Sequence, residues 1–149
     1  MAVFGETKPT PAADGITLEE AYRIVMAARE KALEIDVMMN IAIVDAGNNL
    51  TAFARMDGAW QGSIDIAQGK AYTARAFDME TKALGAAAQV GSPLFGINAS
   101  NNMKIIIFAG GIPLVKNERI VGAIGVSGGS VEQDQTVAEA GVAAFAENK

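Results

Sequence analysis

The chain contains no cysteine and no histidine among its 149 residues. Without cysteine it can form neither a disulfide nor a thiolate nucleophile. Without histidine it lacks the commonest general base, the commonest metal ligand and any Ser-His-Asp triad. We therefore expect no metal site of the usual zinc type, because such sites are built largely from His and Cys.

Basic residues are also scarce, since 12 Lys and Arg stand against 17 Asp and Glu, for a formal charge of −5. Nucleic acids and anionic membrane surfaces both attract clustered Lys and Arg, and the sequence has no such cluster. We therefore expect neither nucleic acid nor a membrane as a partner. The sequence also lacks an apolar run of 18 residues and a signal-peptide pattern, which predicts a cytoplasmic protein.

The length suits one domain with one hydrophobic core. Residues 1–15, which include Pro9 and Pro11, show no periodicity and are expected to form a flexible arm. Residues 16–149 are expected to form the single domain. Half of the chain is apolar, with much of that total in Ala, and there are 16 Gly besides. Small side chains allow close packing within a subunit or between subunits, so we expect a homo-oligomer.

Two helix starts are marked by capping patterns. "TLEE" at 17–20 is a capping box, and apolar residues then recur at helical spacing to about residue 35. "SVEQ", beginning at Ser130, repeats the box and predicts a helix to about residue 146. Between them the pattern predicts a helix over 63–79, capped by Ser63, and a short helical piece over 80–89.

The remaining apolar segments predict strands joined by tight turns. Residues 40–59 form a predicted hairpin that turns at 47–49. Three further strands are predicted over 104–108, 112–116 and 119–127. Because consecutive strands with short turns pair antiparallel, we expect an α+β domain with a five-stranded antiparallel sheet flanked by helices.

The glycine-rich stretch "GVSGGSVEQD", residues 125–134, stands where a strand gives way to a helix. Its spacing does not match the dinucleotide fingerprint, and no Lys follows as a phosphate-binding loop of the Walker type requires. A helix start still offers free amides, so Ser127, Gly128 and Gly129 could hold a carboxylate or phosphate. Alternatively, the glycines only turn the chain while Ser130 caps the helix.

The order of several segments resembles the GlcG/HbpS family of small haem-binding proteins, which includes the C-terminal domain of PduO-type proteins. The resemblance covers about residues 16–145. The segments that carry it are "NIAIVDAGNNLTAFARMDGA", "SIDIAQGKAYTARAF", "FAGGIPLV" and "IVGAIGVSGGSVEQDQTVAEAG".

The resemblance implies a profilin-like domain assembled as a homo-oligomer, from tetramer to octamer, that serves a catabolic pathway or senses haem. Haem iron is usually held by His, Cys, Met or Tyr, so here Tyr22 or Tyr72 would replace the missing His. We expect Tyr22 at the sheet-facing edge of the first helix. Methionines are the other possible ligands, but five are interpreted as core or interface filler: Met38, Met39, Met56, Met79 and Met103.

The first functional hypothesis is therefore a binding protein for a small organic or haem-type ligand. Its cofactor-binding residues would be Tyr72 in "GKAYTA", Gly110 and Gly111 in "GGIP", and the corner of Ser127, Gly128 and Gly129. A neighbouring subunit could complete the pocket.

The second hypothesis is a cofactor-independent lyase, isomerase or hydrolase that acts on a small oxygenated or aromatic acid. Lys70 would be the base, Arg55 would clamp a carboxylate and Glu132 would carry the proton. Each residue also has a structural interpretation. Arg55 could pair with Asp57, Lys70 could reach past the sheet to water, and Glu132 suits a helix start. A third hypothesis is an assembly partner without a pocket.

Overall fold

The centre of the fold is a four-stranded antiparallel sheet with the strand order β2-β1-β4-β3. In the computed structural model, which describes residues 15–146, the strands are β1 (Asn40–Asp45), β2 (Leu50–Arg55), β3 (Gly111–Lys116) and β4 (Arg119–Ser127). The expected α+β class is therefore confirmed, whereas the expected fifth strand is absent from residues 15–146.

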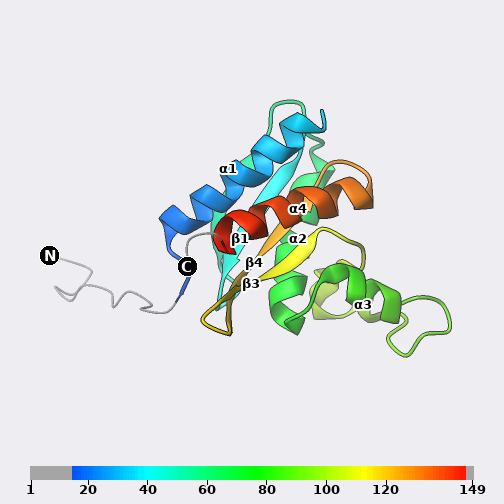
Figure 1. Ribbon diagram of the computed structural model, residues 1–149. Coiled ribbons are helices and arrows are strands. Elements are labelled where there is room, and N and C mark those ends of the chain that lie inside the picture. Colours follow the sequence, from blue (N-terminus) through cyan, green and yellow to red (C-terminus); the bar gives the residue numbers. More distant parts are fainter. Residues whose placement is uncertain (1–14, 147–149) are drawn as a thin grey trace, which may run out of the picture.

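Helices cover both faces of this sheet (Figure 1). The helices α1 (Leu18–Glu34) and α4 (Val131–Ala146) lie side by side on one face, whereas α2 (Gly62–Phe77) packs on the other. The short helix α3 (Thr81–Ala87) follows α2. Side chains alternate along β1 accordingly: Ile41 and Ile43 join the core under α1 and α4, while Ala42 joins the alanine-rich core under α2.

Both predicted capping boxes are present. The Thr17 hydroxyl accepts the Glu20 amide at 3.1 Å while the Glu20 carboxylate accepts the Thr17 amide at 2.8 Å. Ser130 and Gln133 repeat this exchange at the start of α4. The predicted cap at Ser63 is wrong, because α2 begins at Gly62 after Gln61, whose side chain caps nothing. The Ser63 amide instead donates to the Trp60 carbonyl, so a main-chain turn starts this helix.

The predicted strand over 104–108 is also wrong. This segment packs on α2 and α3 instead of joining the sheet. The Ile106 amide donates to the Thr73 hydroxyl on α2 at 2.9 Å. A side chain at Gly85 on α3 would come within 2.0 Å of the Ile107 carbonyl oxygen. The apolar run is therefore partly buried against helices, with Ile105 buried, and side-chain and close-packing contacts replace a strand ladder.

Close approach of α2 to the sheet depends on one glycine of β4. A Cβ atom at Gly125 would lie 2.0 Å from the Ala67 carbonyl oxygen. Opposite it, α2 presents the small buried side chains of Ala67 and Ala71. The abundance of Ala and Gly thus fixes the distance between these layers.

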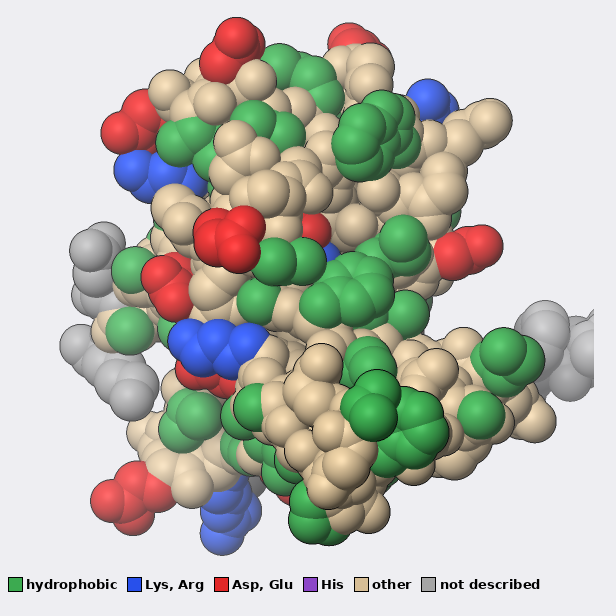
Figure 2. All heavy atoms as spheres, turned by 90° about the vertical axis from the view of Figure 1, so that its right-hand side faces the viewer, with side chains coloured by type: hydrophobic (Ala, Val, Ile, Leu, Met, Phe, Trp, Pro, Cys, Tyr) green, Lys and Arg blue, Asp and Glu red, His purple; other side chains and the backbone are tan. Residues whose placement is uncertain are grey.

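The connection between α3 and β3 exposes much of its apolar surface. Val90 is 87% exposed and Phe95 is 66% exposed. Figure 2 shows apolar side chains gathered across the face on which α3 lies. No helix within residues 15–146 is long and apolar enough to cross a bilayer.

Two further expectations concern the N-terminal part. The predicted arm over 1–15 lies outside the described residues except for its last residue. Tyr22 does not lie at the sheet-facing edge of α1, because its side chain is 56% exposed on the outer side of the helix. Of the methionines, Met39 and Met56 are in the core, whereas Met103 is 75% exposed.

Candidate functional site

The most deeply buried charge is Lys70, whose side chain has no exposed surface. Its ammonium donates to Asp134 Oδ2 at 2.6 Å and to the Val126 carbonyl at 2.8 Å. It also lies 5.0 Å from the centre of the Phe108 ring. Burial lowers the pKa of Lys70 below its ordinary value, and the Asp134 carboxylate offsets part of that effect. The interpretation that Lys70 reaches water is therefore wrong.

Gly110 is the reason that Lys70 on α2 can reach Asp134 on α4, across the end of the sheet. A Cβ atom at Gly110 would lie 2.9 Å from Lys70 Nζ and 3.0 Å from Asp134 Cβ. Its φ of +112° also favours glycine. The neighbouring Gly111 fits against the Lys70 carbonyl, where a Cβ atom would stand at 2.6 Å. Gly110 therefore makes room for the ion pair, whereas Gly111 allows close contact with the main chain of α2.

The glycine corner after β4 is held by the same carboxylate. Asp134 Oδ1 accepts the amides of Gly128 and Gly129, each at 3.0 Å. From the sequence, these amides are a candidate binding site for a carboxylate or phosphate ligand. In the structure they bind an anion from the chain itself, while Ser127 is buried beside them at the end of β4. Four of the predicted residues thus lie against Asp134: Lys70, Gly110, Gly128 and Gly129. Gly111 and Ser127 are their chain neighbours.

The other two predicted catalytic residues lie apart from this centre. Arg55 is exposed at the end of β2, where its guanidinium donates to the Ala59 carbonyl at 3.3 Å and not to Asp57. Glu132 is exposed on the first turn of α4, and hydrogen bonds from its own backbone amide and from Ser130 lower its pKa. The structure does not bring Arg55 or Glu132 into contact with Lys70.

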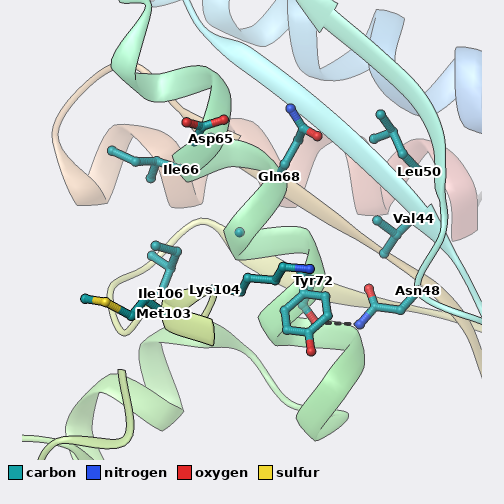
Figure 3. Close-up of a pocket in the computed structure, with 11 residues that line it drawn as sticks. Val44, Asn48, Leu50, Asp65, Ile66, Gln68, Tyr72, Met103, Lys104 and Ile106 are labelled. Atoms are coloured by element: carbon teal, nitrogen blue, oxygen red, sulfur yellow. Dashed lines mark hydrogen bonds between the residues drawn. The ribbon is translucent and has the colours of Figure 1, made fainter. Parts of the chain in front are cut away.

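Tyr72 belongs to a different place, an open pocket beside α2 with a volume of about 380 Å³ (Figure 3). This volume lies within the range of about 300–1,000 Å³ that is usual for small-ligand sites. We call it the Tyr72 pocket. It lies between α2, the β1–β2 hairpin and residues 103–106, and its lining residues are Val44, Asn48, Leu50, Asp65, Ile66, Gln68, Gly69, Tyr72, Met103, Lys104 and Ile106.

Polar groups fix the Tyr72 ring within this pocket. Asn101 Nδ2 donates to the Tyr72 hydroxyl at 3.3 Å, and Asn48 Nδ2 donates to the Tyr72 carbonyl at 3.0 Å. The Lys104 ammonium lies 5.5 Å from the ring centre, which is a cation–π contact. The pocket therefore joins apolar walls to one phenol, the Lys104 cation and the Asp65 carboxylate.

The rim of the pocket has an unusual backbone. Asn101, Asn102 and Met103 have φ values of 52°, 55° and 60°, so three successive residues without glycine are left-handed. Such residues each cost on the order of 1–2 kcal/mol, although Asn tolerates this region better than most. The turn places the Met103 side chain on the pocket wall with most of its surface exposed. Strain of this kind often marks a functional segment.

The donor set of the Tyr72 pocket is compatible with haem. A phenol oxygen and a thioether sulfur are both known haem-iron ligands, and both line the cavity. The walls of Val44, Leu50 and Ile66 offer apolar contact. Within residues 15–146 there is no group of three Asp or Glu side chains that could hold a bare metal ion.

Sequence reasoning found Tyr72 and Lys70 but missed their surroundings. Asp134 as the partner of Lys70 had a signal, because it is an acidic residue directly after the S-x-x-Q box. Met103, Lys104 and Asn48 had no local signal, since they come from segments that meet only in the folded chain.

Comparison with known proteins finds a matching family model and related sequences and structures. A family model described as "Haem degrading protein HbpS-like" matches residues 16–143. An uncharacterized 15.0 kDa protein of Citrobacter freundii, from the dhaT-dhaS intergenic region, is 42% identical over 132 residues, covering 89% of this chain and 93% of that protein.

Two crystal structures share the fold. The Klebsiella pneumoniae protein ORFY has a TM-score of 0.89 and 36% identity, with 99% of this chain and 100% of that chain covered. A PduOC–haem complex has a TM-score of 0.84 and 34% identity, with 87% and 94% covered.

Proposed function

The chain belongs to the HbpS-like family, and from that premise we propose that it binds a haem-type ligand in the Tyr72 pocket. The observation that carries the proposal is the donor set of this pocket. In a chain without His or Cys, Tyr72 and Met103 both line one apolar cavity. The related PduOC structure with haem supports the choice of ligand.

Each lining residue has a separate part in this proposal. Tyr72 or Met103 would contact the iron, and Val44, Leu50 and Ile66 would pack against the macrocycle. Lys104, which is exposed at the rim, would pair with an acidic group of the ligand. When bound, haem would supply ligand-binding or redox chemistry at its iron.

We extend the proposal to the setting of the protein. The family resemblance implies a profilin-like homo-oligomer, between tetramer and octamer, that serves a catabolic pathway, and we propose that it works in the cytoplasm. These features are proposed together with the ligand.

The alternative is a cofactor-independent enzyme with Lys70 as base, and it has less support. The lowered pKa of Lys70 suits a base, but its side chain is fully buried and already donates to two oxygens. Neither Arg55 nor Glu132 reaches it. A substrate would have to displace the Phe108 ring or the Asp134 carboxylate to touch the amine.

Haem titration of the purified protein, followed by absorbance, tests the proposal. We expect a saturable Soret shift that is changed or lost in Tyr72→Phe or Met103→Leu. Tyr22→Phe is the matched control, because Tyr22 lies on α1 at the other face of the sheet. Loss of the shift in Tyr22→Phe alone, or no saturable shift in the wild type, would overturn the proposal.

A further inference from the structure

The outer side of α1 carries a line of exposed apolar side chains. Leu18, Tyr22 and Met26 are 52%, 56% and 48% exposed, and Leu33 is 44% exposed. Spacing of four residues places the first three along one side of the helix. Leu18, Tyr22 and Met26 line a shallow groove of about 640 Å³. We call Leu18, Tyr22, Met26, Ala27 and Leu33, with the charges that flank them, the α1 surface.

The flanking charges have no partners within the described part of the chain. Arg23 and Glu30 both line the groove, and neither forms an ion pair with another residue of 15–146. Seven residues apart, they lie on the same flank of the helix because seven residues make almost two turns. A positive and a negative charge thus stand on either side of Met26 and Ala27.

We propose that the α1 surface is a homotypic interface, in which a second copy of the chain seats its own α1 antiparallel on this one. A two-fold axis between Met26 and Ala27 gives the pairing. It brings Arg23 of each copy beside Glu30 of the other copy and uses the same patch twice, as an isologous contact requires. Arg23 and Glu30 of two copies therefore complement each other only when the helices are antiparallel.

The apolar groups fit the same arrangement. In this register Met26 of one copy faces Ala27 of the other, so a long flexible side chain lies over a small one. Tyr22, the only aromatic residue of α1, lies next to this crossing and supplies the type of side chain that dominates interface energetics. The proposal concerns a face of the sheet opposite to the Tyr72 pocket, so it stands or falls independently of ligand binding.

Charge reversal tests the proposal through the mass in solution, measured by light scattering after size exclusion. The wild type should have an even number of 15.4 kDa chains. Arg23→Glu and Glu30→Arg each place like charges together and should lower the mass twofold. The double variant R23E/E30R restores opposite charges and should restore the wild-type mass. Asp57→Arg, an exposed charge reversal outside α1, is the control.

Mixing the two single variants gives a sharper result. A copy with Glu at both positions and a copy with Arg at both should pair with each other more tightly than either pairs with itself. A monomeric wild type would overturn the proposal. Equal masses for all variants would also overturn it, and would point to another occupant of the α1 surface, such as residues 1–14 of the same chain.

Discussion

The Asp134 carboxylate lies 2.6 Å from the Lys70 ammonium, and their side chains are only 3% and 0% exposed. The pair joins α4 on one face of the sheet to α2 on the other. It passes Gly110, where a side chain would collide with both partners. Through its second oxygen Asp134 also holds two backbone amides of the glycine corner. One carboxylate thus connects both helical layers to the end of β4.

Asp134→Asn is expected to destabilise the fold by about 3–5 kcal/mol, because it leaves a buried ammonium facing an amide donor. Adding Lys70→Met removes that unpaired charge, so the double variant should be more stable than Asp134→Asn alone. Urea unfolding of the wild type, both single variants and the double variant measures the coupling. Additive effects of the two changes would show that the pair acts as two independent groups.

Gly125→Ala should destabilise the protein by about 1–3 kcal/mol or more, because the new methyl group would press on the main chain of α2. Gly62→Ala is the matched control, since nothing lies within 4 Å of a Cβ atom there. The control should leave stability unchanged or raise it by up to about 1 kcal/mol, through helix propensity. Equal melting temperatures for the two variants would contradict the close contact between α2 and β4.

Glu20 should make stability depend on acid pH. Burial raises the pKa of Glu20, but hydrogen bonds from Thr17 and the Lys116 ammonium together lower it below its ordinary value of 4.5. The unfolded chain therefore binds the proton more tightly, so the stabilisation is present above about pH 4.5 and is lost as the pH falls through the folded pKa.

Glu20→Gln keeps the capping box but removes this charge. The difference in unfolding free energy between the wild type and Glu20→Gln should therefore shrink as the pH is lowered from neutral to about 3. A difference that stays constant over this range would show that the Lys116 contact does not favour the ionised carboxylate.

Lys104→Ala should weaken haem binding only a few-fold, because an exposed ion pair contributes on the order of 0.2–1 kcal/mol. The loss should become smaller at high salt, which screens exposed charges. Haem titrations at low and high ionic strength measure this loss of affinity, with Lys31→Ala on α1 as the control. Equal losses in the two variants would indicate a non-specific charge effect.

The sequence correctly predicted the features that depend on contacts between residues close together in the chain. In the capping boxes at Thr17 and Ser130 the hydrogen-bond partners lie three residues apart, so the starts of α1 and α4 were predictable. The apolar run at 104–108 was misread because an apolar segment has the same composition whether it pairs with strands or packs on helices.

The candidate site shows the same division. Lys70 and the glycine corner stood out by residue type, but their common dependence on Asp134 arises across the end of the sheet, 64 residues along the chain from Lys70. The Tyr72 pocket needs the left-handed turn at Asn102 to bring Met103 to it, and no short-range pattern encodes where that turn lies.

The most direct measurement is a crystal structure of the protein soaked with haem. We expect the iron within bonding distance of Tyr72 Oη or Met103 Sδ, with the macrocycle against Val44, Leu50 and Ile66. Haem bound on α1, at the Lys70–Asp134 pair or nowhere in the molecule would contradict a ligand site in the Tyr72 pocket.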